Sequence, residues 1–133
     1  MKNLTRAALI FALGLCLSGS LMAQKPADMV GTWVGMATLE GMADPNQLTL
    51  VVELKEGKIQ GHMTDEFGTL SESPIEEATL KEGAFTFSVK GAGPGGQELT
   101  MSFKMKVDGD SMKGTFEIPD MGMAGTWEST KQK

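Results

Sequence analysis

The sequence contains little of the chemistry on which most active sites depend. Its 133 residues include one cysteine, one histidine, one arginine and no tyrosine. A disulfide scaffold is excluded, because a single cysteine cannot form an intrachain bridge. Acidic residues number 17 against 12 basic ones, which gives a formal charge of −5. Nucleic acids and anionic lipid surfaces are bound by clustered lysine and arginine, so we expect neither as a partner.

The longest apolar run lies near the start of the chain. Lys2 and Arg6 accompany eleven consecutive apolar residues, 7–17, and residues 18–23 are mostly small. This arrangement is typical of a secretory signal peptide. The run is shorter than the ~20 residues needed to span a bilayer, and no later run supplies a transmembrane segment. We expect cleavage after residue 23 and a periplasmic or secreted mature chain.

Cleavage there would change the chemical inventory of the protein. The mature chain, 24–133, would hold no cysteine and no arginine, and its 10 lysines against 17 acids would give a formal charge of −7. The alternative is a lipoprotein anchored through Cys16, although the preceding Leu15 is not the small residue that such sites prefer.

From Val30 onward, short alternating runs are separated by glycine-rich turns at nearly even spacing, and a short leader, 24–29, precedes them. Such spacing is typical of a β-sandwich or barrel. Acid–glycine pairs tolerate the positive φ of tight hairpins, which favours sequential antiparallel neighbours. These pairs are Glu56-Gly57, Glu82-Gly83 and Asp108-Gly109. The predicted strands cover residues 31–39, 47–55, 58–65, 75–81, 84–90, 97–107, 111–118 and 124–131.

Each predicted strand has one apolar and one polar face. In 97–107, the residues Leu99, Met101, Phe103, Met105 and Val107 alternate with polar side chains. Closing such a sheet buries its apolar face and removes both edges. We therefore predict an all-β, eight-stranded antiparallel up-and-down barrel over 24–133, with methionine and glycine but no charge turned inward. The polar outer faces argue against an outer-membrane barrel.

Two similar motifs open the first and last predicted strands, Gly31-Thr32-Trp33 and Gly125-Thr126-Trp127. With the eight-strand meander and its turn glycines, they resemble the calycin-like barrels, meaning lipocalins, fatty-acid-binding proteins and avidins. The chain is also similar to small exported bacterial domains that begin with G-T-W-x-G and end with G-T-W. The resemblance implies a calycin-like barrel. Trp33 and Trp127, on the adjacent first and last strands, would close its seam; the alternative, which we favour, is that they fill the core.

The chain departs from each calycin family at its binding residues. Lipocalins cover the tryptophan with an arginine of the last strand, for which this chain offers only Lys131 as a weak substitute. Fatty-acid-binding proteins use internal arginine and tyrosine, and avidins use tyrosine and several tryptophans. The resemblance therefore extends to the fold and not to the ligands of those families.

No arrangement of residues indicates an enzyme. His62 adjoins Met63, which shares the inward face with Ile59, so the histidine should point outward rather than toward a nucleophile. Glu76 and Glu77 should face opposite sides of one strand, which excludes them as a catalytic pair. We expect no catalytic residue and no cofactor.

Methionine is unusually frequent, with 11 residues. Thioethers suit Cu(I), so Met121, Met123 and His62 form an alternative metal site. Methionine also fills irregular gaps in small cores, and we favour that interpretation.

The leading hypothesis is an exported, non-enzymatic barrel that binds a small apolar ligand, which enters through loops 40–47, 91–96 and 119–124. The alternatives are a Cu(I)-binding protein and a structural or protein-interaction domain of the cell envelope, with an unknown protein partner. The candidate ligand-binding residues are Trp33, Met63, Phe85, Phe87, Met101, Phe103, Met105, Phe116 and Trp127.

Overall fold

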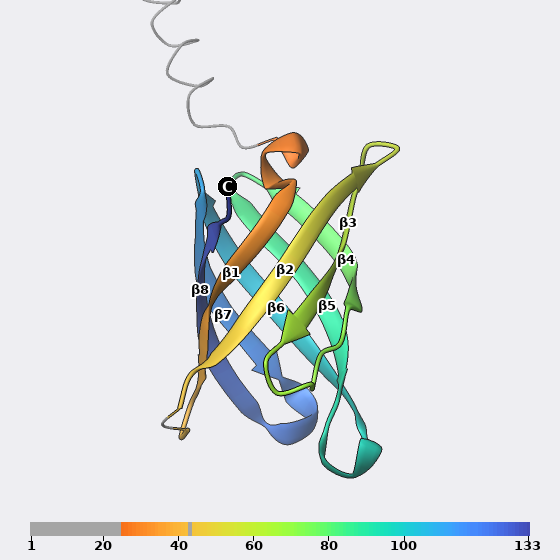
Figure 1. The fold of residues 1–133 in the computed structure, drawn as a ribbon, viewed down its shortest axis with the longest axis vertical. Coiled ribbons are helices and arrows are strands. Elements are labelled where there is room, and N and C mark those ends of the chain that lie inside the picture. Colours follow the sequence, from red (N-terminus) through yellow and green to blue (C-terminus); the bar gives the residue numbers. More distant parts are fainter. Residues whose placement is uncertain (1–24, 43) are drawn as a thin grey trace, which may run out of the picture.

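The computed structural model describes residues 25–42 and 44–133. The expected signal segment, 1–23, and Cys16 lie outside the described residues. Eight antiparallel strands follow one another in chain order and form a closed barrel, in which the last strand pairs with the first (Figure 1). The predicted all-β up-and-down barrel is confirmed.

The strand limits agree with the predicted ones to within two residues. The strands are β1 (Gly31–Leu39), β2 (Asn46–Lys55), β3 (Lys58–Asp65), β4 (Ser73–Lys81), β5 (Ala84–Ala92), β6 (Glu98–Asp108), β7 (Ser111–Ile118) and β8 (Met123–Lys131). Three short 3-10 turns accompany them: η1 (Pro26–Met29), η2 (Pro94–Gly96) and η3 (Pro119–Met121).

The hairpins form where acid–glycine pairs predict them. Glu56 and Gly57 have φ values of 51° and 77°, and Glu82 and Gly83 have values of 52° and 80°. Two consecutive residues with positive φ are what a type I′ turn requires, and this turn matches the twist of the flanking strands.

The barrel has two different ends. The end that we call the sealed end carries the three tight hairpins, η1 and the C-terminus, and it is uppermost in Figure 1. The opposite end, the loop end, carries the longer connections 40–45, 66–72, 93–97 and 119–122.

The barrel interior is filled by side chains at every second strand position. Four of the chain's six phenylalanines form a column there. Its ring centroids lie 5.1 Å apart for Phe85 and Phe87, 4.7 Å for Phe87 and Phe103, and 5.1 Å for Phe103 and Phe116. Trp127 meets Phe103 edge-on at 5.9 Å. These rings pack with the offset and T-shaped geometries that aromatic quadrupoles favour, and they occupy the middle of the barrel.

Strand β4 is the irregular part of the wall. It pairs with β3 only through His62–Pro74 and Met63–Ser73, and its register with β5 shifts between Glu76 and Thr79. Glu77 has a φ of 53° within this bulge. Glu76 and Glu77 are both exposed, which corrects the expectation that they face opposite sides of the sheet. The bulge adds a residue and so changes the alternation.

Some strand glycines allow neighbouring backbones to approach closely. A Cβ atom on Gly114 of β7 would lie 2.0 Å from the backbone oxygen of Lys104 in β6. A Cβ atom on Gly61 would lie 2.1 Å from the backbone oxygen of Val51. The strands can therefore bend over one another only where a side chain is missing.

We predict that Gly114→Ala lowers the free energy of unfolding by about 2–3 kcal/mol, because the added methyl group must displace β6. Urea denaturation measures this change. Thr115→Ala, at the adjacent exposed position, should change stability by no more than about 0.5 kcal/mol. Equal stabilities for the two variants would contradict this account of the glycine.

Candidate functional site

The sealed end is closed by η1, which packs against Trp33. The indole Nε1–H of Trp33 donates to the backbone oxygen of Met29 at 2.9 Å, and both side chains are fully buried. The sequence predicts only a leader over these residues. The structure shows instead a 3-10 turn whose Met29 belongs to the core.

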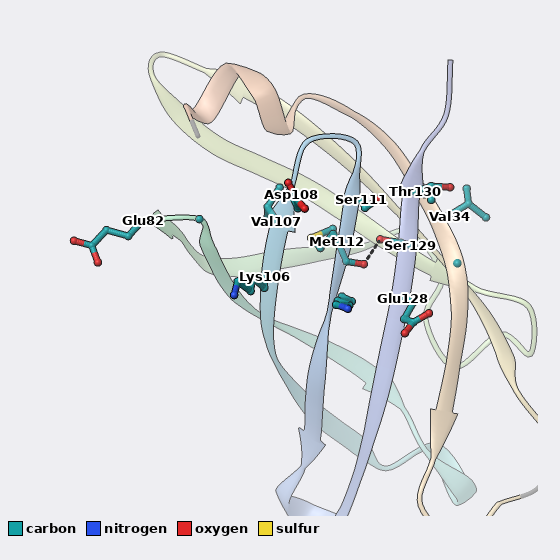
Figure 2. A pocket seen from close by; sticks show the side chains of 13 residues that line it. Val34, Glu82, Lys106, Val107, Asp108, Ser111, Met112, Glu128, Ser129 and Thr130 are labelled. Carbon is teal, nitrogen blue, oxygen red and sulfur yellow. Dashed lines mark hydrogen bonds between the residues drawn. The ribbon is translucent and has the colours of Figure 1, made fainter. Parts of the chain in front are cut away.

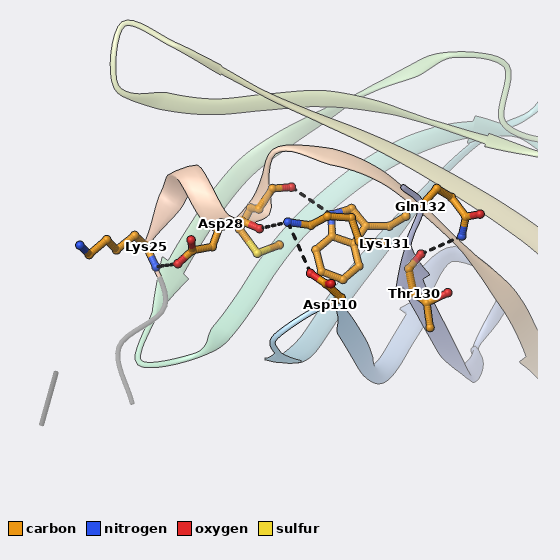
Figure 3. A network of polar contacts seen from close by, with 8 residues as sticks. Lys25, Asp28, Asp110, Thr130, Lys131 and Gln132 are labelled. Carbon is orange, nitrogen blue, oxygen red and sulfur yellow. Dashed lines mark hydrogen bonds and ion pairs between the residues drawn. The ribbon is translucent and has the colours of Figure 1, made fainter. Parts of the chain in front are cut away.

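Lys131 of β8 lies over the indole ring of Trp33. Figure 3 shows Lys131 between Asp28 and Asp110. Its Nζ lies 5.3 Å from the centroid of the indole ring, donates to the backbone oxygen of Asp28 and lies 4.0 Å from the Asp110 carboxylate. Lys131 therefore takes the position over the tryptophan that the sequence analysis considered for it, and its ammonium also contacts η1 and the β6–β7 hairpin. No ligand can pass through this end without displacing these groups.

The nine predicted ligand-binding residues are all in the interior. Their exposed fractions lie between 0% and 6%. Met101 and Phe116 line a cavity at the loop end, and the other seven are packed against one another away from it. The seven are Trp33, Met63, Phe85, Phe87, Phe103, Met105 and Trp127.

The loop-end cavity has a volume of about 210 Å³. Its apolar lining consists of Ala37, Leu39, Met42, Leu48, Phe67, Leu70, Leu99, Met101, Phe116 and Ile118, and its polar lining of Asp44, Asn46, Asp65 and Thr69. Of the predicted rim, only the stretch 40–47 contributes loop residues. The stretches 91–96 and 119–124 contribute none, and the unpredicted connection 66–72 takes their place.

The connection 66–72 is held over the cavity from both sides. The N–H of Ala92 in β5 donates to the backbone oxygen of Thr69 at 2.9 Å, and Leu70 is 1% exposed. A Cβ atom on Gly91 would lie 2.9 Å from the Leu70 side chain, so the glycine makes room for this leucine. Phe67 remains at the mouth with 70% of its surface exposed.

Asp65 is a charged residue inside the barrel. It ends β3 on the inward face and is 8% exposed. One carboxylate oxygen accepts from the N–H of Leu70 at 2.9 Å, and the other accepts from Nδ2 of Asn46 at 3.1 Å. This corrects the prediction of an interior without charge. The signal was present in the sequence, because two steps along the strand from the inward Met63 lead to Asp65.

Asn46 begins β2 beside Asp65 and also lines the cavity. Its Oδ1 atom is buried and has no hydrogen-bond partner among the described residues. Turning the amide over would place this oxygen against the Asp65 carboxylate, so the observed orientation is the favourable one. The wall of the cavity therefore contains a buried amide oxygen that has no donor among the described residues.

A larger depression of about 1040 Å³ lies on the outside of the wall over β1, β8, β7 and β6 (Figure 2). Its charges are mixed, with Lys106 and Lys113 beside Asp108 and Glu128, and all four side chains are exposed. A small molecule there would remain largely in water, so we place the candidate site in the smaller, enclosed cavity.

The alternative metal ligands are not brought together. His62 is half-buried in β3 between Val51 and Pro74, whereas Met121 is in η3 and Met123 begins β8. Strands β3 and β8 share no neighbour in the barrel order. Within residues 25–42 and 44–133, no group of three histidine, cysteine or acidic side chains is arranged to hold a metal ion.

Compared with protein-family models, curated proteins and solved structures, the chain matches none of them. The structural assignment therefore depends on the closed eight-stranded antiparallel barrel, which is consistent with a calycin-like fold. In the described part of the chain, no helix has the length and apolar character needed to cross a bilayer.

We predict that Lys131→Met lowers the free energy of unfolding by about 1 kcal/mol, because the ammonium no longer interacts with the Trp33 ring. Urea denaturation followed by tryptophan fluorescence checks this. Lys131→Arg should stay close to the original protein, and Lys133→Met serves as the control for loss of an exposed charge. A Lys131→Met protein as stable as its parent would show that the contact contributes nothing.

Proposed function

We propose that the protein is an exported, non-enzymatic, calycin-like barrel that binds a small, mainly apolar ligand at its loop end. The observation that carries the proposal is the enclosed cavity of about 210 Å³, which is lined mainly by apolar side chains. The exposed side chains of Met42 and Phe67 extend this apolar surface to the mouth.

The size of the cavity limits the ligand. Typical sites for drug-sized ligands measure ≈ 300–1,000 Å³, which is more than this cavity offers. Between the cavity and the sealed end, the phenylalanine column and the two tryptophans fill the barrel. A ligand of this cavity is therefore a compact molecule or a short chain, and not a long fatty acid that runs along the barrel axis.

Export is part of the same proposal. It is supported by the composition of residues 1–23, in which a basic start precedes an apolar run of signal-peptide length. The mature protein would then act in the periplasm or outside the cell. Attachment to a membrane through Cys16 is the alternative form of the same exported protein.

Methionine methyl signals in NMR spectra provide a direct test, because the chain distributes its methionines along the barrel. Met42 and Met101 line the cavity, whereas Met112 is buried near the β6–β7 hairpin at the sealed end. We expect n-hexanol to shift the Met42 and Met101 signals saturably and to leave Met112 unchanged. Uniform or non-saturating shifts would reject a specific site.

A pair of matched variants locates the site. Leu39 is half-buried in the cavity wall, and Leu54 is a partly exposed leucine near the other end of the barrel, in β2. Leu39→Trp should weaken n-hexanol binding by about tenfold or more, because the indole fills the space the ligand needs. Leu54→Trp should leave the affinity unchanged. The proposal fails if both variants bind as the parent does.

A further inference from the structure

Asp65 is nine-tenths buried without an ion pair among the described residues. A buried carboxylate is costly unless hydrogen bonds or a positive partner compensate for lost hydration. Asp65 accepts from Leu70 and Asn46, yet an ionised carboxylate offers about four acceptor sites. The carboxylate therefore retains accepting capacity next to the cavity that it lines.

The unpaired Oδ1 of Asn46 is a second sign that acceptors in the cavity wall outnumber the donors that reach them. A buried acceptor without a donor costs about 1–3 kcal/mol. Both unsaturated groups in the cavity wall are acceptors, and among the described lining residues the only hydroxyl is that of Thr69, which bonds to neither. The polar part of the cavity wall therefore holds accepting positions that no donor of the described residues occupies.

The charges around the mouth of the cavity favour a positively charged hydrogen-bond donor. The four loop-end connections, 40–45, 66–72, 93–97 and 119–122, contain five acidic residues and no lysine or arginine. These acids are Glu40, Asp44, Glu66, Glu72 and Asp120, and all are exposed. A rim of one sign raises the local concentration of oppositely charged ligands and repels those of the same sign.

We infer, on the basis of the proposed function, that the ligand of the loop-end cavity is a small organic cation with a primary ammonium group on an apolar body. Its three N–H donors suit the accepting positions that the Asp65 carboxylate retains beside the cavity. Its apolar body would lie against Leu39, Met101 and Ile118. A metal cation fits less well, because hard ions require more oxygen ligands than this mainly apolar lining supplies.

Three ligands of equal length separate the charge from the apolar part: n-hexylammonium, n-hexanol and n-hexanoate, titrated at neutral pH with the methionine methyl signals as readout. Alkylamines remain protonated at this pH, as lysine does. We expect n-hexylammonium to bind about tenfold or more tightly than n-hexanol, as for a charge-assisted hydrogen bond worth more than a neutral one. n-Hexanoate should bind most weakly.

Asp65→Asn tests the assigned carboxylate with little change of shape. The new amide can still accept from Leu70, and a turned Asn46 can accept from its NH₂ group, so connection 66–72 keeps its anchor. This variant should lose the preference for n-hexylammonium and retain n-hexanol binding. Glu128→Gln, which removes an exposed charge on the outer wall of β8, should retain the preference.

The outcomes distinguish the two proposals. Equal affinity of the parent protein for n-hexylammonium and n-hexanol would overturn the cationic ligand and leave the apolar site intact. Absence of binding by all three ligands would overturn the site itself. The ranking by the parent protein needs no variant, so it decides the question even if Asp65→Asn does not fold.

Discussion

The pairing of β1 with β8 is the interaction on which the rest of this structure depends. It joins the first strand of the barrel to the last one, with Trp33 opposite Lys131 and Ala37 opposite Trp127. The same seam lets the indole N–H of Trp127 donate to the backbone oxygen of Gly35 at 3.1 Å. Without it the apolar faces of eight strands would form an open sheet with one side in water.

Closure of the seam also makes the two ends of the barrel different. At one end, β8 delivers Lys131 to Trp33 and to η1, so the Lys131 ammonium and the Trp33 indole N–H both have partners within the protein. At the other end, longer connections cross the opening, and Asp65 and Asn46 keep accepting capacity there. The two ends therefore differ in how completely the described polar groups are paired within the protein.

The regular parts of the barrel could be predicted from the sequence because alternation and turn chemistry are local. The strand limits and the inward aromatic residues follow from every second residue being apolar. The hairpins follow from the acid–glycine pairs between the strands. The turn η1 could not be predicted in this way, since four residues carry no periodicity. The position of Lys131 over Trp33 depends on a long side chain that reaches across the seam, which no local pattern encodes.

The candidate site was predictable only in part. Met101 and Phe116 follow from alternation, and Asp65 follows from the same rule when it is applied to the last residue of β3. The placement of 66–72 over the cavity depends on the hydrogen bond that Leu70 donates to the Asp65 carboxylate and on the one that Ala92, distant in the chain, donates to Thr69. The cavity volume depends on how the side chains pack around it, and sequence alone does not give packing.

The short pairing between β3 and β4 leaves part of two strand edges facing each other without a ladder. Exposed edges invite pairing with other chains, which leads to aggregation. Here Pro74 removes a donor, the bulge at Glu77 bends the strand, and the carboxylates of Glu76 and Glu77 face water. These features disfavour pairing of β4 with a strand of a second molecule, so the incomplete β3–β4 ladder does not provide an edge for aggregation.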